Sequence, residues 1–306
     1  MKTNLLRLLI FKFMYSIRRT GCFSYLIVFI GVLLPQLSLA SQSSITQAAG
    51  SACRMKQQTN TSVESQALLN AKRQAVEFAQ THISVQSKVS NFKLEKDIIK
   101  SFAEANVTVL SVLKKYWDNK KKCYSINIMA EVIPVNSLLA NNDLLMMNNP
   151  SAPLTVKIWT DHAEYKTGQY MTIYLKGNKP FYGRLLYKDA AGNLLQILPN
   201  PNRKNNFFNG SVVYQIPNAE DAFELLIEPP FGDEMLTLYA STAPLGKIDK
   251  VNAGAVYKVT ESSEKIAYKT RGIRIVTNQG NFKDDNYRKN KLVEFAETST
   301  NTVILK

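Results

Sequence analysis

The spacing of apolar and polar residues changes near residue 150 and divides the chain into two kinds of pattern. In the first part, Thr61 followed by Glu64 forms a capping box, which marks the start of a helix. Small apolar residues then recur every four positions, at Ala67, Ala71, Ala75 and Ala79. A stripe of small residues on one face lets a helix lie close against a sheet. We therefore predict a helix from residue 61 to about residue 80.

A second helix and a β-hairpin are expected after this helix. The segment LEKDIIKSFAEA, residues 94–105, has a helical pattern. Residues 107–117 and 123–133 are rich in β-branched and aromatic residues, and the polar DNKKK between them predicts a turn. Residues 61–135 are thus expected to form a small α+β domain, made of a helix and a β-hairpin.

From residue 154 the pattern is one of short strands separated by turn residues. The expected strands cover residues 154–159, 170–176, 181–189, 194–198, 211–216, 222–228 and 234–241. Seven strands at this spacing indicate an all-β, immunoglobulin-like sandwich, which we assign to residues 154–306. In its C-terminal extension, GIRIV and NTVILK have strand character and residues 281–297 are weakly helical. Whether this extension belongs to the sandwich is left open.

Two polar segments are interpreted as linkers. Residues 41–60 are small and polar, which indicates a linker or a short ordered arm. Residues 136–153 carry asparagines and prolines around a short Leu/Met piece that has room for one helical turn. The expected fold class is therefore α+β, with two domains joined by the second linker.

Residues 1–40 differ in composition from the rest of the chain. They contain five basic residues and no acidic one, followed by the apolar run CFSYLIVFIGVLL and a small-x-small end at Ala40. This order is typical of a secretory signal peptide, cleaved after Ala40 to give a periplasmic or secreted protein. A start at Met14 instead of Met1 would give a signal of ordinary length. The alternative is an uncleaved anchor, although the apolar run is shorter than the roughly 20 residues that span a bilayer.

Export changes what the charge and the cysteines imply. Without the signal segment 1–40, the formal net charge falls from +14 to +9, and a basic chain favours anionic neighbours such as lipid phosphate or polysaccharide. A soluble protein with a lysine-rich face is the alternative, because the lysines are spread along the chain. In an oxidising compartment Cys53 and Cys123 predict a disulfide, the alternative being two separate buried thiols. The cysteines and histidines lack metal-ligand spacing, so no metal or cofactor is expected.

Two resemblances rest on short motifs. The ordered set YKTGQYMTIY (165–174), KDAAGNLLQILPNP (188–201), the Ile-Pro at 216–217 and EPPFGDEMLTLYAS (228–241) resembles the bacterial domain of unknown function 4384, over residues 154–245. Through ESQALLNAKRQAVEFA and YWDNKKKCYSINIMAEV, residues 64–135 are similar to the LPP-twenty-like envelope lipoproteins and to the N-terminal domain of a flagellar assembly protein. The chain lacks an acylatable cysteine at the end of its signal. The resemblance implies an exported, non-catalytic envelope module and transfers no ligand-binding residue.

The sequence contains few candidates for catalysis. It has neither a Gly-x-Ser-x-Gly elbow nor a phosphate-binding glycine loop. The cluster TDHAEY places Asp161, His162 and Glu164 together, and a carboxylate–histidine pair can transfer protons. A solvated connection between a strand and a turn has the same composition. We therefore expect no enzyme.

The stretch ILPNPNRKNNFFNG, residues 197–210, is the candidate ligand-binding loop. Its polar residues could donate to phosphates or sugar hydroxyls, and its aromatic residues could stack on a ring. The candidate residues are Asn200, Asn202, Arg203, Lys204, Phe207 and Phe208. The alternative is a long turn in which one phenylalanine fills the end of the sandwich. No nucleic-acid-binding module is recognisable, so no nucleic acid partner is expected.

These observations favour an exported envelope protein that acts as a protein-interaction or assembly module, with partners that the sequence does not name. The alternative is a binding module for an anionic envelope glycan or lipid head group, acting through the loop. A hydrolase of unknown substrate is the third possibility.

Overall fold

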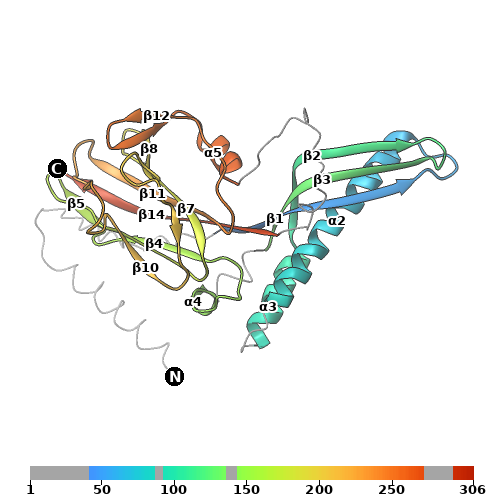
Figure 1. The fold of residues 1–306 in the computed structure, drawn as a ribbon, viewed down its shortest axis with the longest axis horizontal. Coiled ribbons are helices and arrows are strands. Elements are labelled where there is room, and N and C mark those ends of the chain that lie inside the picture. Colours follow the sequence, from blue (N-terminus) through green and yellow to red (C-terminus); the bar gives the residue numbers. More distant parts are fainter. Residues whose placement is uncertain (1–40, 87–91, 136–142, 272–291) are drawn as a thin grey trace, which may run out of the picture. The chain divides into compact units, whose positions relative to one another are not determined.

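The computed structural model describes residues 41–86, 92–135, 143–271 and 292–306 (Figure 1). The predicted signal peptide, the GIRIV strand at 272–276 and part of the second predicted linker lie outside these residues. Within the described part of the chain, no helix combines the length and the apolar character that crossing a membrane requires.

The N-terminal part is a three-stranded layer covered on one face by a long helix (Figure 1). Its elements are β1 (Ser41–Cys53), α2 (Asn60–Gln86), α3 (Phe92–Ala103), β2 (Asn106–Asp118), β3 (Cys123–Ile133) and α4 (Asp143–Met147). Helix α2 packs on β1 and β3, and the four alanines of the predicted stripe are fully buried in this contact. The predicted stripe and hairpin are thus confirmed. The helix extends to Gln86, past its predicted end near residue 80.

Two details of this region differ from the prediction. The Thr59 hydroxyl, not that of Thr61, accepts a hydrogen bond from the Ser62 N–H at 3.2 Å, so the helix begins earlier than the capping box indicated. Glu64 instead accepts a hydrogen bond from the indole N–H of Trp117 at 3.1 Å. Tertiary contact with the hairpin therefore recruits the side chain that the local motif assigned to the cap.

Residues 41–53, which we interpreted as part of a linker, form the central strand β1. It pairs antiparallel with β14 through residues 41–45 and with β3 through residues 44–53. Its small, polar residues give little local strand signal, but they allow a helix to approach the sheet closely. An added Cβ at Gly50 would lie only 2.1 Å from the Ala67 carbonyl oxygen of α2. The prediction of a linker here was wrong because the small residues serve packing and not flexibility.

The predicted disulfide is present between β1 and β3. Cys53 and Cys123 are directly opposite each other in the ladder and are separated by 70 residues in sequence. In the chain-entropy description, closing a loop of this length stabilises the native state by about 4 kcal/mol. The bond therefore fastens the end of β1 to the hairpin.

The C-terminal part consists of strands with one short helix. Its elements are β4 (Val156–Thr160), β5 (Glu164–Lys166), β6 (Ile173–Gly177), β7 (Phe181–Lys188), β8 (Leu194–Leu198), β9 (Phe207–Phe208), β10 (Val213–Ile216), β11 (Gly232–Ser241), β12 (Lys250–Ala253), β13 (Val256–Val259), α5 (Ser263–Thr270) and β14 (Val293–Leu305). The strands form a large sheet in the order β12-β13-β8-β7-β11-β14-β1-β3-β2, with β5 on β14 and β9 on β7, and a small sheet in the order β10-β6-β4. Only the β5–β14 pair is parallel among these described ladders.

The large sheet is covered on both faces in its C-terminal half. On one face, the small sheet contributes Ile158, Ile173 and Ile216 to a core shared with the large sheet. On the other face, Ile266 of α5 and Val259 of β13 join a second cluster, packed on Tyr239 and Phe295 of the sheet. Burial of these apolar side chains holds the layers together.

The α+β fold class is confirmed, but the arrangement differs from two separate domains. Strand β14 pairs with both β11 and β1, so one sheet runs from the expected sandwich into the N-terminal part. The smaller layer has three strands, which makes the sandwich unequal and unlike the expected immunoglobulin-like pair of sheets. Part of the C-terminal extension thus completes the large sheet.

Two local predictions in this part were wrong. The described end of the weakly helical segment 281–297 lies in β14, where sheet pairing overrides a helical pattern. The strand predicted at 222–228 is an irregular extended segment. It is hydrogen-bonded through Leu225 and Ile227 to residues 168–171 and makes only an isolated bridge at Leu226.

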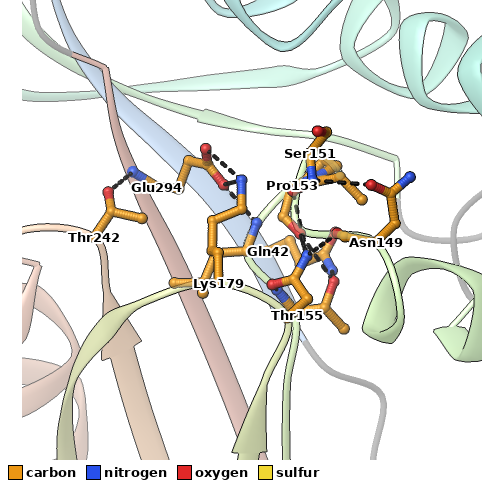
Figure 2. A network of polar contacts seen from close by, with 11 residues as sticks. Gln42, Asn149, Ser151, Pro153, Thr155, Lys179, Thr242 and Glu294 are labelled. Atoms are coloured by element: carbon orange, nitrogen blue, oxygen red, sulfur yellow. Dashed lines mark hydrogen bonds and ion pairs between the residues drawn. The ribbon is translucent and has the colours of Figure 1, made fainter. Parts of the chain in front are cut away.

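Figure 2 shows a polar network buried where β1, β14 and the β6–β7 turn meet. The Lys179 ammonium lies 3.0 Å from both carboxylate oxygens of Glu294, and both side chains are almost fully buried. Glu294 also accepts a hydrogen bond from the Leu154 N–H at 2.5 Å, and Gln42 donates to Thr155 at 2.8 Å. These bonds fix the segment that enters the small sheet to the central strands.

Candidate functional site

The predicted ligand-binding loop is largely held by its own internal bonds. The Asn200 side chain, 1% exposed, donates to the Ile197 carbonyl at 2.9 Å and accepts from the Asn202 and Arg203 N–H groups at 2.8 and 2.6 Å. The Arg203 guanidinium forms a mostly buried ion pair with Asp221 at 2.8 Å. Asn200 and Arg203 therefore stabilise the loop, and their polar groups already have partners.

The two phenylalanines of the loop have different surroundings. Phe208 is 1% exposed and stacks on Phe181 with ring centroids 5.2 Å apart, as the alternative interpretation of a core-filling residue expected. Phe207 is 43% exposed and meets the edge of the Tyr182 ring. Of the six candidates, the exposed ones are Asn202, Lys204 and Phe207. For these three, a role in ligand binding stays a prediction.

The TDHAEY cluster lies at the end of β4 and is built around a buried tyrosine. The Asp161 carboxylate accepts hydrogen bonds from the Tyr165 hydroxyl and from the Thr172 N–H, and lies 3.1 Å from the His162 imidazole. Burial acts to raise the pKa of Asp161, but these hydrogen bonds outweigh it and hold the pKa below its usual value. Burial and the neighbouring Asp161 raise the pKa of Tyr165 to about 12. The arrangement keeps Asp161 ionised as an anchor for the turn.

Two further carboxylates, those of Glu234 and Glu297, lie beside tyrosines. The Tyr187 hydroxyl donates to Glu234, and burial raises the pKa of Glu234 above its usual value. Burial likewise raises the pKa of Glu297, which lies opposite Tyr239 in the ladder. Across the described ranges, no group of three or more His, Cys, Asp or Glu residues is placed to hold a metal ion.

A hollow of about 480 Å³ lies on the face of β1, β3 and β2 that α2 leaves open. Its floor consists of small residues such as Ala49, Ser51 and Ser125. Tyr116 and Lys114 of β2 border one side, and Gln74 of α2 borders it as well. Alternation along the strands explains the hollow, because the large apolar side chains of β3 point to α2 and the small polar ones point away.

The edges of β1 and β2 near this hollow differ in whether side chains cap their backbone groups. Beyond the residues that pair with β14, the free edge of β1 is capped by α2: Gln74 accepts from the Ala49 N–H and Asn70 donates to the Ser51 carbonyl at 2.8 Å. Strand β2 ends the sheet and has no neighbouring strand on its outer side among the described residues. The Tyr268 hydroxyl donates a hydrogen bond to the Leu110 carbonyl of β2, just before Ser111.

The outer segment of β2 exposes a mixed apolar and basic surface. Val112, Leu113 and Tyr116 are 51%, 43% and 58% exposed, and Lys114 and Lys115 lie between them. We call these five residues the β2 edge surface. The adjoining turn adds three exposed lysines, and Asp118 is the only carboxylate of residues 106–122. The segment therefore combines open backbone hydrogen-bonding groups, apolar side chains and positive charge.

The sequence did not single out this surface. Residues 107–117 form a strand of the hairpin, as predicted. Whether a strand lies at the edge of a sheet, however, depends on long-range pairing. The available local signal was the apolar run VLSVL followed by Lys-Lys, because a lysine pair in an apolar strand is common at sheet edges.

One region of this chain matches a known protein family. Searches among curated proteins and among solved structures found no match. The looser resemblance of residues 64–135 to envelope lipoproteins stays a prediction. Residues 164–244, which include strands β5 to β11, match the family described as "Domain of unknown function (DUF4384)", and this confirms the resemblance inferred for residues 154–245.

Proposed function

We propose that the protein is a non-catalytic interaction module of the bacterial cell envelope, and that it binds an extended acidic segment of a partner protein along the β2 edge surface. The contrast between the two edges carries this proposal. Among the residues that the structure describes, Asn70 and Gln74 cap β1, whereas nothing caps the outer side of β2 from Ser111 onward. An open edge of this kind can accept a further strand through backbone hydrogen bonds.

The side chains of this surface define the chemistry of the partner. A strand added to β2 would cover part of Val112, Leu113 and Tyr116, and the burial of apolar surface favours association. The two lysines of the strand and the three of the turn would lie beside the added segment, and they favour acidic residues there. Two irregularities in the β2–β3 register, together with the lysines, disfavour edge-to-edge pairing of two copies of this protein.

The rest of the chain supports a role outside the cytoplasm. The disulfide between β1 and β3 suits an oxidising compartment, and the segment 1–40 has the composition of a secretory signal. The Asn200, Arg203 and Asp161 side chains are engaged in structural bonds, which supports binding and not catalysis as the activity.

Crosslinking and co-purification from an intact envelope, with the full-length exported protein as bait, tests the proposal. The bait is compared with the double variant Lys114→Glu plus Lys115→Glu. Lys204→Glu is the control, because Lys204 is also an exposed lysine and lies on the candidate loop. We expect the double variant to reduce recovery of the partner at least tenfold and the control to leave it unchanged.

Hydrogen–deuterium exchange of the purified complex then locates the contact. Added-strand pairing protects the outward N–H groups of residues 111–117, so slower exchange there supports the proposal. If a partner binds equally well to the double variant and leaves these amides unprotected, docking at the β2 edge is wrong. A partner lost only with Lys204→Glu would instead move the site to the candidate loop.

A further inference from the structure

The outer face of the small sheet carries a pair of aromatic rings beside two lysines. Strands β4, β6 and β10 bury Ile158, Ile173, Leu175 and Ile216 against the large sheet, so the alternate positions point away from the core. Figure 1 labels β4 and β10 of this sheet. The outward positions are Lys157 and Trp159 in β4, Tyr174 and Lys176 in β6, and Val213 and Gln215 in β10. None of these residues takes part in the β2 edge surface.

The outward residues lie in two adjacent rows across the sheet. Trp159 pairs with Tyr174, which pairs with Gln215, and these three form an aromatic row. Lys157 pairs with Lys176 to form a basic row. Because the rows are two residues apart along each strand, their backbones are about 7 Å apart.

The aromatic row places two stacked rings, each partly exposed, on the outer face of the sheet. The Trp159 and Tyr174 rings are stacked, with centroids 5.6 Å apart and planes inclined by 17°, and both side chains are only partly buried. Near-parallel rings on an open sheet form a shallow apolar platform. The axial C–H groups of a pyranose ring can pack on such a platform, and the Gln215 amide at the end of the row can bond a sugar hydroxyl.

The basic row indicates that the ligand is anionic. Like charges directly opposite each other in a ladder are destabilising, yet Lys157 and Lys176 are such a pair. Within the described residues, no ion pair joins either lysine to a carboxylate. The Lys157 ammonium lies 5.7 Å from the centroid of the Trp159 ring, so the basic row lies next to the aromatic rings. A bound carboxylate would remove the repulsion and gain two ionic contacts.

We propose that this face is a binding site for an acidic glycan, with a hexuronate ring on Trp159 and Tyr174 and its carboxylate between Lys157 and Lys176. A glycan fits better than single-stranded nucleic acid, which would need a basic groove along several phosphates, whereas this face offers two opposed lysines on a flat sheet. The site is separate from the β2 edge surface, so it adds a glycan contact to the proposed protein contact.

Titration with oligosaccharides tests the site through tryptophan fluorescence. The chain has two tryptophans, and Trp117 packs against Tyr124 on the hairpin, so a Trp117→Phe background reports on Trp159 alone. The probes are hexamers of galacturonate, alginate fragments and hyaluronan fragments, with methyl-esterified galacturonate hexamer as an uncharged control of the same rings. We expect at least one acidic probe to shift the emission of Trp159 and to bind at least tenfold more tightly than the ester.

Variants separate the two rows. The double variant Lys157→Gln plus Lys176→Gln should abolish the preference for the acidic probe over the ester. Trp159→Ala, made in the chain that keeps Trp117, should weaken binding of the acidic probe at least tenfold, as measured by calorimetry. If Trp159→Ala does not fold by circular dichroism, Tyr174→Ala takes its place. Absence of binding to all three acidic probes, equal binding of acid and ester, or tighter binding of an oligothymidylate would each overturn the proposal.

Discussion

Substituting alanine at Gly50 tests the close packing of α2 on β1, on which the N-terminal half depends. Gly50 does not have a positive φ, so its backbone accepts an alanine, and a Gly→Ala change at such a site would by itself stabilise by about 0.4–1 kcal/mol. The added Cβ, however, would lie 2.1 Å from the Ala67 carbonyl oxygen and 2.3 Å from the Ala71 nitrogen. Ordinary contact begins at 3.4 Å, so both backbone atoms would have to move away from the strand.

The atoms in the way belong to the helix backbone, which cannot rotate aside as a flexible side chain can. The helix must move outward, and a gap of about 0.5–1 Å already loses a quarter to a half of each dispersion contact. The four fully buried alanines of the stripe share this loss. We therefore expect Gly50→Ala to destabilise the protein by about 3 kcal/mol, at the upper end of ordinary overpacking.

Urea unfolding of the oxidised protein, followed by circular dichroism at 222 nm, measures this change. With an m-value of about 3 kcal/mol/M, the midpoint should fall by about 1 M. Ser51→Ala is the matched control on the same strand, because its side chain is exposed on the opposite face, and it should change the free energy of unfolding by less than about 0.5 kcal/mol. A Gly50→Ala variant that unfolds at the same or higher urea concentration would refute the close approach of helix and strand.

Three further predictions address the buried polar groups. Lys179→Met should lower the free energy of unfolding by about 3–5 kcal/mol, because it leaves the Glu294 carboxylate buried without a counter-charge. Adding Glu294→Gln to this variant should recover more than half of the loss. A loss below about 1 kcal/mol for Lys179→Met in urea unfolding would contradict this expectation. Arg203→Ala should lower the free energy of unfolding by about 1.5–3 kcal/mol in the same assay, because Arg203 has a mostly buried ion pair. Lys204→Ala should lower it by less than about 0.5 kcal/mol. Equal effects of the two substitutions would count against a structural role for the arginine. Because burial raises the pKa of Glu234, the native state holds a proton that the unfolded state releases, so wild-type stability should fall relative to Glu234→Gln as the pH rises from about 4 to 7. Parallel pH profiles of the two proteins would exclude this effect.

The candidate loop shows which property of a residue its local sequence leaves open. Asparagines, an Arg-Lys pair and two phenylalanines have the composition of a binding loop, and the same residues can also close a long turn. Burial differs from residue to residue in this loop: Asn200 and Phe208 are each 1% exposed and serve the fold, while Lys204 is exposed and its role in ligand binding stays a prediction. A sequence does not reveal whether a polar side chain turns inward to its own backbone, because that depends on which strands the loop connects.

Local patterns alone determined much of this protein. The alanine period predicted α2 and its buried face, the β-rich segments around DNKKK predicted the hairpin, and Cys53 and Cys123 predicted the disulfide. The local spacing of residues predicts the helix and the hairpin, because the hydrogen bonds of both join residues that are close in sequence. The family resemblance of residues 154–245 was likewise readable from ordered motifs.

Only the tertiary structure decided which elements became neighbours. Residues 41–53 have almost no strand signal, yet β14 and β3 pair with them on both sides and make them a central strand. The same long-range pairing merged the two expected domains into one sheet, left β2 at an open edge and placed Trp159 beside Tyr174 on an outer face. These positions depend on contacts between residues far apart in the chain, and the periodicity of a single segment contains no information about them.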